Sequence, residues 1–211
     1  MTLTAQAPAS QDDAAPKSRL SGEARREQFL NAAAAIVLEL GTAAVTMNSV
    51  AVRTGVTKRL GYRYFENRTE LLKALIDREL AQVGQRADAV LSPDAAFEEV
   101  IVVNITVWLQ LFEERGPLLN RLLFGQDVVP TIAANLNARS ADKWGRGWGD
   151  FLQTDDVTAE ILTRLYLSAL RGAVEALERG LAPLEEIAAI YATVAIAGGK
   201  AAAERRRKLT P

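Results

Sequence analysis

Proline and glycine punctuate this chain at the ends of runs in which apolar residues recur every three or four positions. That period is typical of helices that bury one face, whereas half-buried strands alternate with a period of two. No convincing alternating segment occurs after Ser21. Proline lacks a backbone donor and glycine adopts positive φ freely, so both favour helix ends. The sequence therefore predicts an all-α protein.

Three short helices are predicted near the N-terminus, each starting at a Ser or Thr that can accept a hydrogen bond from a free backbone N–H. They run over residues 21–41, 46–55 and 57–64. A glycine turn separates the last two, which is the arrangement of a helix-turn-helix. Asn67 followed by Glu70 is a capping box, so a fourth helix is expected from Arg68 to about Ala89.

Longer helices are predicted beyond about residue 78. Ser92-Pro93-Asp94 is typical of a helix start, and that helix should close at Arg115-Gly116. Further helices are expected over residues 117–125, 130–153, 155–179 and 183–208. Glycines at 145, 147 and 149 lack the spacing of a phosphate loop, so they predict a helix break or close helix packing.

Composition divides the chain into three parts. Residues 1–20 are rich in Ala, Pro, Ser and Gln without an apolar period, which predicts a disordered arm. Residues 21–75 form the predicted helix-turn-helix head, and residues 76–211 form a larger helical body.

Basic residues are concentrated in the head. The segment from Thr46 to Arg68 has one acid, Glu66, against Arg53, Lys58, Arg59, Arg63 and Arg68. Because the whole chain has a net charge of only −1, any affinity for nucleic acid must come from such local clustering. Basic residues alone would favour a solvated surface, whereas their place on a helix-turn-helix favours binding to a duplex.

The chain contains no cysteine and no histidine. This excludes disulfides, Cys/His zinc sites, thiolate nucleophiles and Ser-His-Asp triads, and no carboxylate pair stands out as an acid/base couple. We expect no enzyme activity, no metal and no cofactor. The longest uncharged apolar stretches, residues 100–112 and 187–199, are shorter than the roughly 20 residues that span a bilayer. We expect a cytoplasmic protein.

An ordered series of residues runs through the head: Phe29-Leu30-Asn31-Ala32-Ala33, Gly41, Thr46, Val50-Ala51, Gly55-Val56-Thr57-Lys58, Tyr62-Arg63-Tyr64-Phe65, Asn67-Arg68 and Glu70-Leu71-Leu72. This series resembles the N-terminal domain of the TetR family of transcriptional regulators and covers about a quarter of the chain. The rest is similar to the family only in size and helical organisation. The resemblance implies that the third helix lies in the major groove of DNA.

The resemblance also implies which head residues contact DNA. Lys58 and Arg59 are best placed for guanine edges, at about 1–3 kcal/mol of discrimination each, and Arg63 less so. Tyr62 and Arg68 would contact phosphate. The other expected contacts are Thr46, Thr57, Leu60 and Tyr64. Packing between helices is the alternative for the two tyrosines.

Two neighbouring positions depart from the family's pattern. Leu60 and Gly61 stand where members usually carry a small hydroxyl residue followed by a bulky aliphatic one. Either Leu60 turns inward, or Gly61 lets another backbone approach.

The body mixes aromatic side chains with a few polar ones, which suits an apolar pocket that orients a ligand. The expected ligand-binding residues are Asn104, Trp108, Phe112, Trp144, Trp148, Phe151 and Tyr166. Core packing explains any single one of them better. Because the resemblance implies an effector in the body, we expect a small hydrophobic or aromatic molecule.

Small and apolar residues form one stripe in each of the last two predicted helices. They are Leu162, Leu165, Ala169, Ala173 and Leu177, and Ala188, Ala192, Ala195, Gly199 and Ala202. Such stripes let helices approach closely, so they predict a two-fold four-helix dimer interface, with packing inside one subunit as the alternative.

The function expected is that of a ligand-responsive transcriptional repressor. It would bind a palindromic operator on double-stranded DNA as a homodimer and leave it when an effector binds. One alternative is a structural DNA-binding protein without sequence preference. The other is a helical enzyme without histidine or cysteine.

Overall fold

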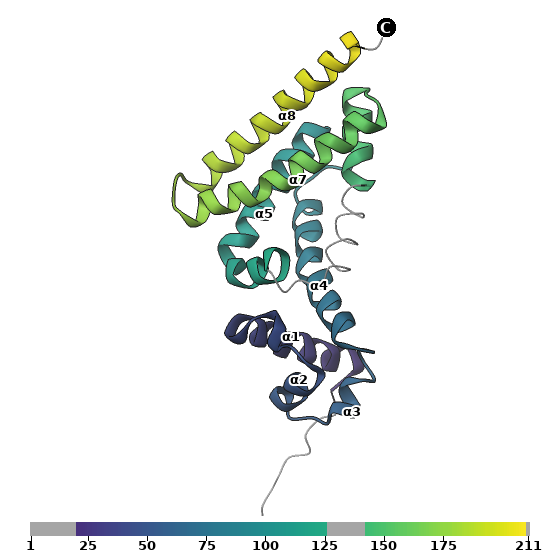
Figure 1. Ribbon diagram of the computed structural model, residues 1–211, viewed down its shortest axis with the longest axis vertical. Coiled ribbons are helices and arrows are strands. Elements are labelled where there is room, and N and C mark those ends of the chain that lie inside the picture. The colour runs from purple at the N-terminus through teal and green to yellow at the C-terminus, as the bar shows by residue number, and fades with distance from the viewer. Residues whose placement is uncertain (1–19, 126–141, 210–211) are drawn as a thin grey trace, which may run out of the picture.

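The computed structural model describes residues 20–125 and 142–209, and every regular element in these ranges is helical, as predicted (Figure 1). The head contains α1 (Gly22–Leu40), the 3₁₀ turn η1 (Thr42–Ala44), α2 (Met47–Thr54), α3 (Lys58–Gly61) and the start of α4 (Arg68–Asp88). The body adds α5 (Phe97–Leu119), the π turn η2 (Asn120–Phe124), a helix over residues 142–152, α7 (Asp156–Glu178) and α8 (Leu184–Leu209). The predicted arm, apart from residue 20, lies outside the described residues. So does the part of the helix predicted over residues 130–153 that precedes residue 142.

Side-chain caps start the head helices where the sequence predicts. The Ser21 hydroxyl accepts from the Ala24 N–H at 3.1 Å. Thr46 and Ser49 form a reciprocal capping box, with both N–H···O distances at 2.9 Å. Gly55, at φ 67°, ends α2 in the left-handed conformation that glycine adopts without a Cβ clash. These bonds fix the entry and exit of α2.

The next two helices differ from the prediction in detail. Thr57 caps α3, but α3 ends at Gly61 and continues only as a turn to Tyr64. Asn67 caps α4 by accepting from the Glu70 N–H at 2.9 Å. The Glu70 carboxylate accepts from the Glu66 N–H instead of closing the box at Asn67.

The predicted start of α5 is wrong by four residues. The Ser92 hydroxyl donates to Asp94 Oδ1 at 2.8 Å and the Ala95 N–H donates to the Ser92 carbonyl at 3.1 Å, so the segment forms a separate turn before α5. Helix α5 begins at Phe97 after Ala96, which offers no side-chain hydrogen bond. The predicted end at Arg115-Gly116 is a kink, since Arg115 has φ −133° and ψ 16° and the helix then resumes.

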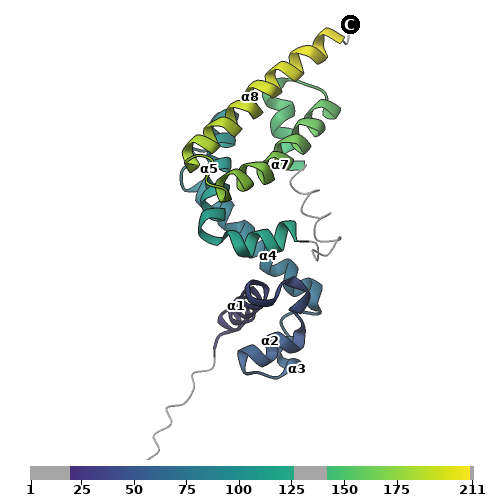
Figure 2. The same cartoon turned by 60° about the vertical axis from the view of Figure 1, so that its left-hand side comes forward.

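Two apolar cores lie along the molecule, joined by α4 (Figure 2). The head core gathers buried residues of α1, α2 and the first turns of α4, and it also takes Leu118 and Leu122 from the end of α5 and η2. The body core is built on α5, α7 and α8 around Trp148. The end of α5 is therefore shared between the two.

The helix over residues 142–152 runs without a break through its three glycines, and close packing explains the one at Gly147. A Cβ at Gly147 would overlap the Phe97 ring. Opposite, a Cβ at Gly199 of α8 would come within 2.8 Å of the Trp148 ring. Glycine at these two positions lets the aromatic core of the body approach the helix backbones.

Candidate nucleic-acid interface and body pocket

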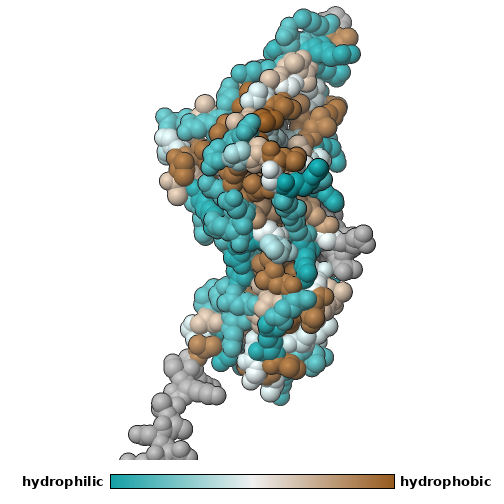
Figure 3. All heavy atoms as spheres, turned by 90° about the vertical axis from the view of Figure 1, so that its left-hand side faces the viewer, coloured by the Kyte–Doolittle hydropathy of each residue, from teal (hydrophilic) through white to brown (hydrophobic). Residues whose placement is uncertain are grey.

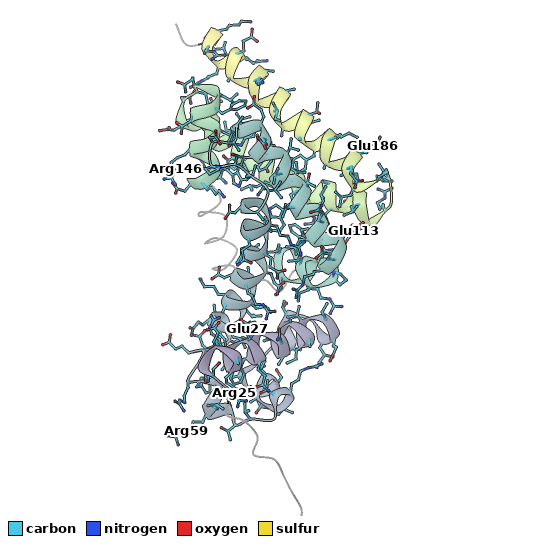
Figure 4. All side chains as sticks on the ribbon, turned by 180° about the vertical axis from the view of Figure 1, so that it is seen from behind. Arg25, Glu27, Arg59, Glu113, Arg146 and Glu186 are labelled. Carbon is cyan, nitrogen blue, oxygen red and sulfur yellow. The ribbon has the colours of Figure 1, made fainter. Side chains whose placement is uncertain are left out.

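The short helix α3 carries an exposed cationic surface at the end of the head that faces away from the body. Lys58, Arg59 and Arg63 are exposed, and Figure 4 shows Arg59 at this end. Within residues 20–125 and 142–209, none of the three forms an ion pair. Their charge is therefore available to an external anion.

Lys58 and Tyr62 form a local unit on this surface. The Lys58 ammonium lies 5.7 Å from the centre of the Tyr62 ring, a cation–π contact. Tyr62 is 48% exposed, and no described residue hydrogen bonds to its hydroxyl. The contact places an ammonium and a phenol beside each other, a pairing suited to a phosphate.

Two of the five basic residues in the predicted cluster, Arg53 and Arg68, bind other groups of the same chain. Arg53 forms a bidentate ion pair with Glu39, at 2.5 and 2.6 Å, and the hydrogen bonds from Arg53 lower the pKa of the Glu39 carboxyl. Arg68 donates from Nε to the Val45 carbonyl and from Nη2 to the Thr42 carbonyl, both at 2.8 Å.

Arg68 therefore connects α4 to η1, and we drop it from the expected phosphate contacts because its Nε and Nη2 already donate to backbone carbonyls.

The remaining expected DNA contacts differ in burial. Thr46 and Thr57 are exposed, with hydroxyls that serve as caps. Tyr64 is half-buried, with its ring centre 5.6 Å from that of Phe29, so packing accounts for it.

The departure at Leu60 and Gly61 has a simple structural basis. Gly61 is buried, and a Cβ there would lie 3.2 Å from Met47 Cε and 3.7 Å from Phe29 Cε1. Leu60 is half-buried against the head core. Leu60 thus turns inward, and Gly61 admits side chains of α1 and α2, not another backbone.

A cavity of about 530 Å³ lies in the body between α4, α5 and the helix over residues 142–152. Three of the seven expected ligand-binding residues line it: Asn104, Trp108 and Trp144. The Asn104 carbonyl oxygen accepts from the Tyr166 hydroxyl at 3.1 Å, which leaves its amide N–H₂ to donate elsewhere.

One wall of this cavity is not predicted by the sequence. It is formed by α4 and includes Asp77, Leu80, Val83, Gly84 and Asp88. An amphipathic helix shows which face is apolar but not which neighbour leaves a gap beside it, so nothing in the sequence marks these residues.

The other four expected ligand-binding residues lie elsewhere. Phe112 stacks on Phe124, with ring centres 5.9 Å apart. Phe151 packs on Phe97 in the aromatic core, with ring centres 5.3 Å apart. Trp148 and Tyr166 line a second, largely apolar cavity of about 400 Å³ between α7 and α8. Burial raises the pKa of the Tyr166 phenol, so this group stays neutral.

The predicted dimer stripe divides between the inside and the outside of the subunit. The members buried against the body core are Leu162, Ala173, Ala188, Ala192 and Gly199. These five pack inside the subunit, as in the alternative to a dimer interface. Leu177, Ala195 and Ala202 are half-buried, and Leu165 and Ala169 are exposed. The repeat identified the core-facing side of α8, because a helix that packs closely inside the subunit shows the same small-residue spacing.

A different set of apolar side chains on α7 and α8 is exposed. They are Val157, Ile161 and Leu165 on α7 and Ile190 and Val194 on α8, each more than half exposed. Each helix repeats them every four residues, so they form two adjacent rows, which we call the outer face. Hydrophobic surface collects on the body on the side where α8 lies (Figure 3).

By length and composition α8 also meets the criteria for a membrane-spanning helix, although only 33% of its most apolar window is buried. A core helix of a soluble protein meets the same criteria, and α8 packs on α5 and α7. The large apolar residues that α8 exposes within the outer face are Ile190 and Val194.

Comparison with known proteins connects these features to a family. Residues 29–75 match the sequence model described as bacterial regulatory proteins of the tetR family. A curated relative from Mycobacterium tuberculosis, an uncharacterized HTH-type transcriptional regulator, is 26% identical over 123 residues. The match covers 53% of this chain and 61% of that relative, so the similarity spans less than two thirds of its length.

Solved structures share the fold over most of the chain. A TetR-like transcriptional regulator from Rhodococcus sp. RHA1 has a TM-score of 0.67 at 18% identity, covering 85% of this chain and 98% of that one. A structure described as a complex of SmeT with triclosan has a TM-score of 0.62 at 21% identity, covering 82% of this chain and 90% of that one. At these identities the likeness concerns the fold.

Proposed function

This chain belongs, by its N-terminal segment and its fold, to the TetR family of bacterial regulatory proteins, and we propose that it represses transcription as an effector-responsive homodimer. In this proposal two heads bind the two halves of a palindromic operator in the cytoplasm. A small hydrophobic or aromatic molecule bound in each body lowers the affinity for that operator.

The observation that carries the proposal is the exposed, unpaired cationic surface of α3. Lys58 and Arg59 begin the second helix of the helix-turn-helix, where side chains reach base edges in the major groove. Arg63 and the Lys58–Tyr62 pair lie beside them and suit phosphates. The same element thus offers groups for reading sequence and groups for fixing register.

The homodimer is supported by the outer face. Five large apolar side chains in two adjacent helical rows are unusual on a surface that stays in water. A second copy related by a two-fold axis would cover both rows at once, since a two-fold interface pairs the same patch of both subunits. Two heads held in one assembly would match an operator with two half-sites.

The effector site is supported by the cavity beside α4. Its volume of about 530 Å³ lies within the range of small-molecule pockets, and it combines two tryptophans with the free amide of Asn104. SmeT, which shares this fold, is described in complex with an aromatic molecule, triclosan. An effector acts only through its different affinity for the DNA-binding and non-binding arrangements.

Selection of bound duplexes from random DNA tests the DNA-binding part of the proposal. We expect a palindromic consensus, retained at least about 10³-fold more tightly than scrambled sequence. Equal retention of scrambled DNA would instead support the structural DNA-binding alternative.

Sedimentation of the Val194→Glu variant tests the dimer. We expect a dimer for the parent chain at micromolar concentration and a monomer for the variant, because the new charge would be buried in the interface. Thr193→Glu is the matched control, since it adds the same charge at the neighbouring exposed position of α8, a polar residue outside the two rows. A monomeric parent chain would remove the homodimer from the proposal. A parent chain found only in the membrane fraction would replace the second copy with lipid.

Tryptophan fluorescence tests the effector site. Compounds from an apolar and aromatic library should change the emission of the parent chain, and the change should shrink in Trp108→Phe. No response to any compound would count against a ligand of this class.

A further inference from the structure

A buried carboxylate lies where the head meets the body. Glu79, in the middle of α4, is only 1% exposed and contacts two arginines. Arg78 Nη2 lies 2.9 Å from its Oε1, and Arg115 Nη1 lies 3.1 Å from its Oε2. Gln82 adds a hydrogen bond to Oε2 at 3.1 Å. Removing a charge from water is unfavourable unless it is paired in this way, so the cluster holds its partners in place.

The cluster stands between the two apolar cores. On α4 the fully buried residues of the head core end at Ile76, and those of the body core begin at Val83. On α5, the segment just after Arg115 contributes Leu118 to the head core and Leu119 to the body core. The ion pairs thus join α4 and α5 where apolar packing passes from one core to the other.

Arg78 extends the cluster into the head. Its Nη1 donates to Glu27 Oε2 at 3.0 Å and to Asn31 Oδ1 at 2.8 Å, both on α1. Figure 4 shows Glu27 on the side of the head nearest the body. One guanidinium therefore connects the buried carboxylate of α4 to the first helix of the head.

Arg115 extends the cluster toward the body cavity. It occupies the kink of α5, with φ and ψ outside the helical region, so its reach to Glu79 depends on that kink. Trp108, Phe112 and Arg115 follow each other on one face of α5, and Trp108 lines the cavity. On α4 the residue next to Glu79, Leu80, lines the same cavity. Any shift of α5 against α4 at the cavity changes the distance between Arg115 and Glu79.

We propose that Arg115, Glu79 and Arg78 form an ionic latch that positions the head on the body, and that a ligand in the body cavity acts on the head through Arg115. This inference rests on the proposed function and names how its DNA-binding site is regulated. The three side chains are positioning residues, because none of them lies on the α3 surface.

Spin-label distances test the latch without any ligand or DNA. The chain has no cysteine, so Glu66→Cys in the head and Arg179→Cys in the body give one labelled pair, diluted with unlabelled chain to isolate distances within a subunit. We expect one narrow distance population for the parent chain and a broad or second population for Glu79→Gln and for Arg115→Gln. Arg86→Gln is the matched control, since Arg86 also bridges α4 to α5, through Glu114 at 2.7 Å, but does not reach the head. A Glu79→Gln distribution equal to that of Arg86→Gln would overturn the latch.

Operator spacing gives a second measurement that loss of stability alone would not change. The parent chain should prefer one half-site spacing by about 10-fold over a spacing altered by one base pair, and Glu79→Gln should reduce this preference to about 3-fold or less. A variant that was merely less stable would lose affinity equally at every spacing. A parent chain without sequence preference would refute the proposed function, while the spin-label result would still decide the latch.

A second variant covers the case in which Glu79→Gln does not fold. Glu79→Met combined with Arg115→Met replaces the buried pair by apolar side chains of similar length, a change that often preserves folding. We expect a folded chain whose head-to-body distances are broad. Narrow, parent-like distances in this double variant would show that apolar packing alone positions the head, and the latch would be wrong.

Discussion

The head and the body reach the same helical architecture by different means. Every α-helix of the head begins at a side chain that accepts a backbone hydrogen bond three residues ahead, namely Ser21, Thr46, Thr57 or Asn67. In the body, α7 has such a cap at Asp155, but the long helix α5 begins without one, and aromatic rings around Trp148 pack the body helices together.

The two regions also differ in the chemistry of their exposed surfaces. The head exposes cations on α3, and the body exposes apolar rows on α7 and α8. Because side-chain caps stabilise the head helices, their outer surface can carry cations that bind a polyanion. The body helices are stabilised by apolar packing, and the apolar rows on their outside could pack in the same way on a second copy.

The largest effect should come from the body core. Trp148→Ala removes a side chain that is 1% exposed, and we expect the free energy of unfolding to fall by about 3–5 kcal/mol. Chemical denaturation followed by circular dichroism measures this. Trp108→Ala is the control, because its half-buried ring borders a cavity and should contribute less. Equal losses would contradict the role given to the core around Trp148.

A smaller loss is expected when a head cap is removed. Thr46→Ala deletes one half of the capping box of α2, which should lower the free energy of unfolding by about 1 kcal/mol. Thr46→Ser keeps the hydroxyl and should stay close to the parent chain in the same denaturation experiment. No difference between the two variants would mean that local capping does not stabilise the head.

Adding a cap to the body should give a modest gain. Ala96 is the exposed N-cap of α5, and Glu99 stands three residues ahead, so Ala96→Ser completes a capping box. We expect the free energy of unfolding to rise by about 0.5–1 kcal/mol, measured as an increase in the denaturation midpoint. Ala95→Ser, one position earlier, should give no gain. Equal changes would argue against a missing cap.

The smallest effect is expected at Gly61. The added Cβ of Gly61→Ala would meet the flexible end of Met47 at 3.2 Å, while alanine improves helix propensity by up to about 1 kcal/mol. The two contributions oppose each other, so the midpoint of denaturation should move little. A large loss would show that the contact between α3 and α2 is rigid.

The sequence predicts the structure best where it depends on near neighbours. The caps at Ser21, Thr46, Thr57 and Asn67 involve partners three residues away, so the pattern of residues contains them. The failure at Ser92 is also local, because the Ala95 N–H donates to the Ser92 carbonyl and closes a turn before α5 begins.

Contacts between residues far apart in the chain are not visible in the sequence pattern. Arg68 was expected to contact phosphate, but its carbonyl partners lie 23 and 26 residues earlier. Glu79 looks in sequence like one more solvated charge on α4, and only the tertiary structure brings Arg115 to it. The small-residue stripe of α8 identified a close contact without saying whether the neighbour belongs to the same subunit.

Neutralising the α3 surface is the most direct test of the account. Lys58→Gln combined with Arg59→Gln removes two exposed charges that form no ion pair in the described chain, so folding should be unaffected. At about 1–3 kcal/mol for each contact, the preference for the selected operator over scrambled DNA should fall by at least about 30-fold. Arg164→Gln, which removes an exposed charge in the body, should leave it unchanged. An undiminished preference in the double variant would contradict the claim that α3 reads DNA.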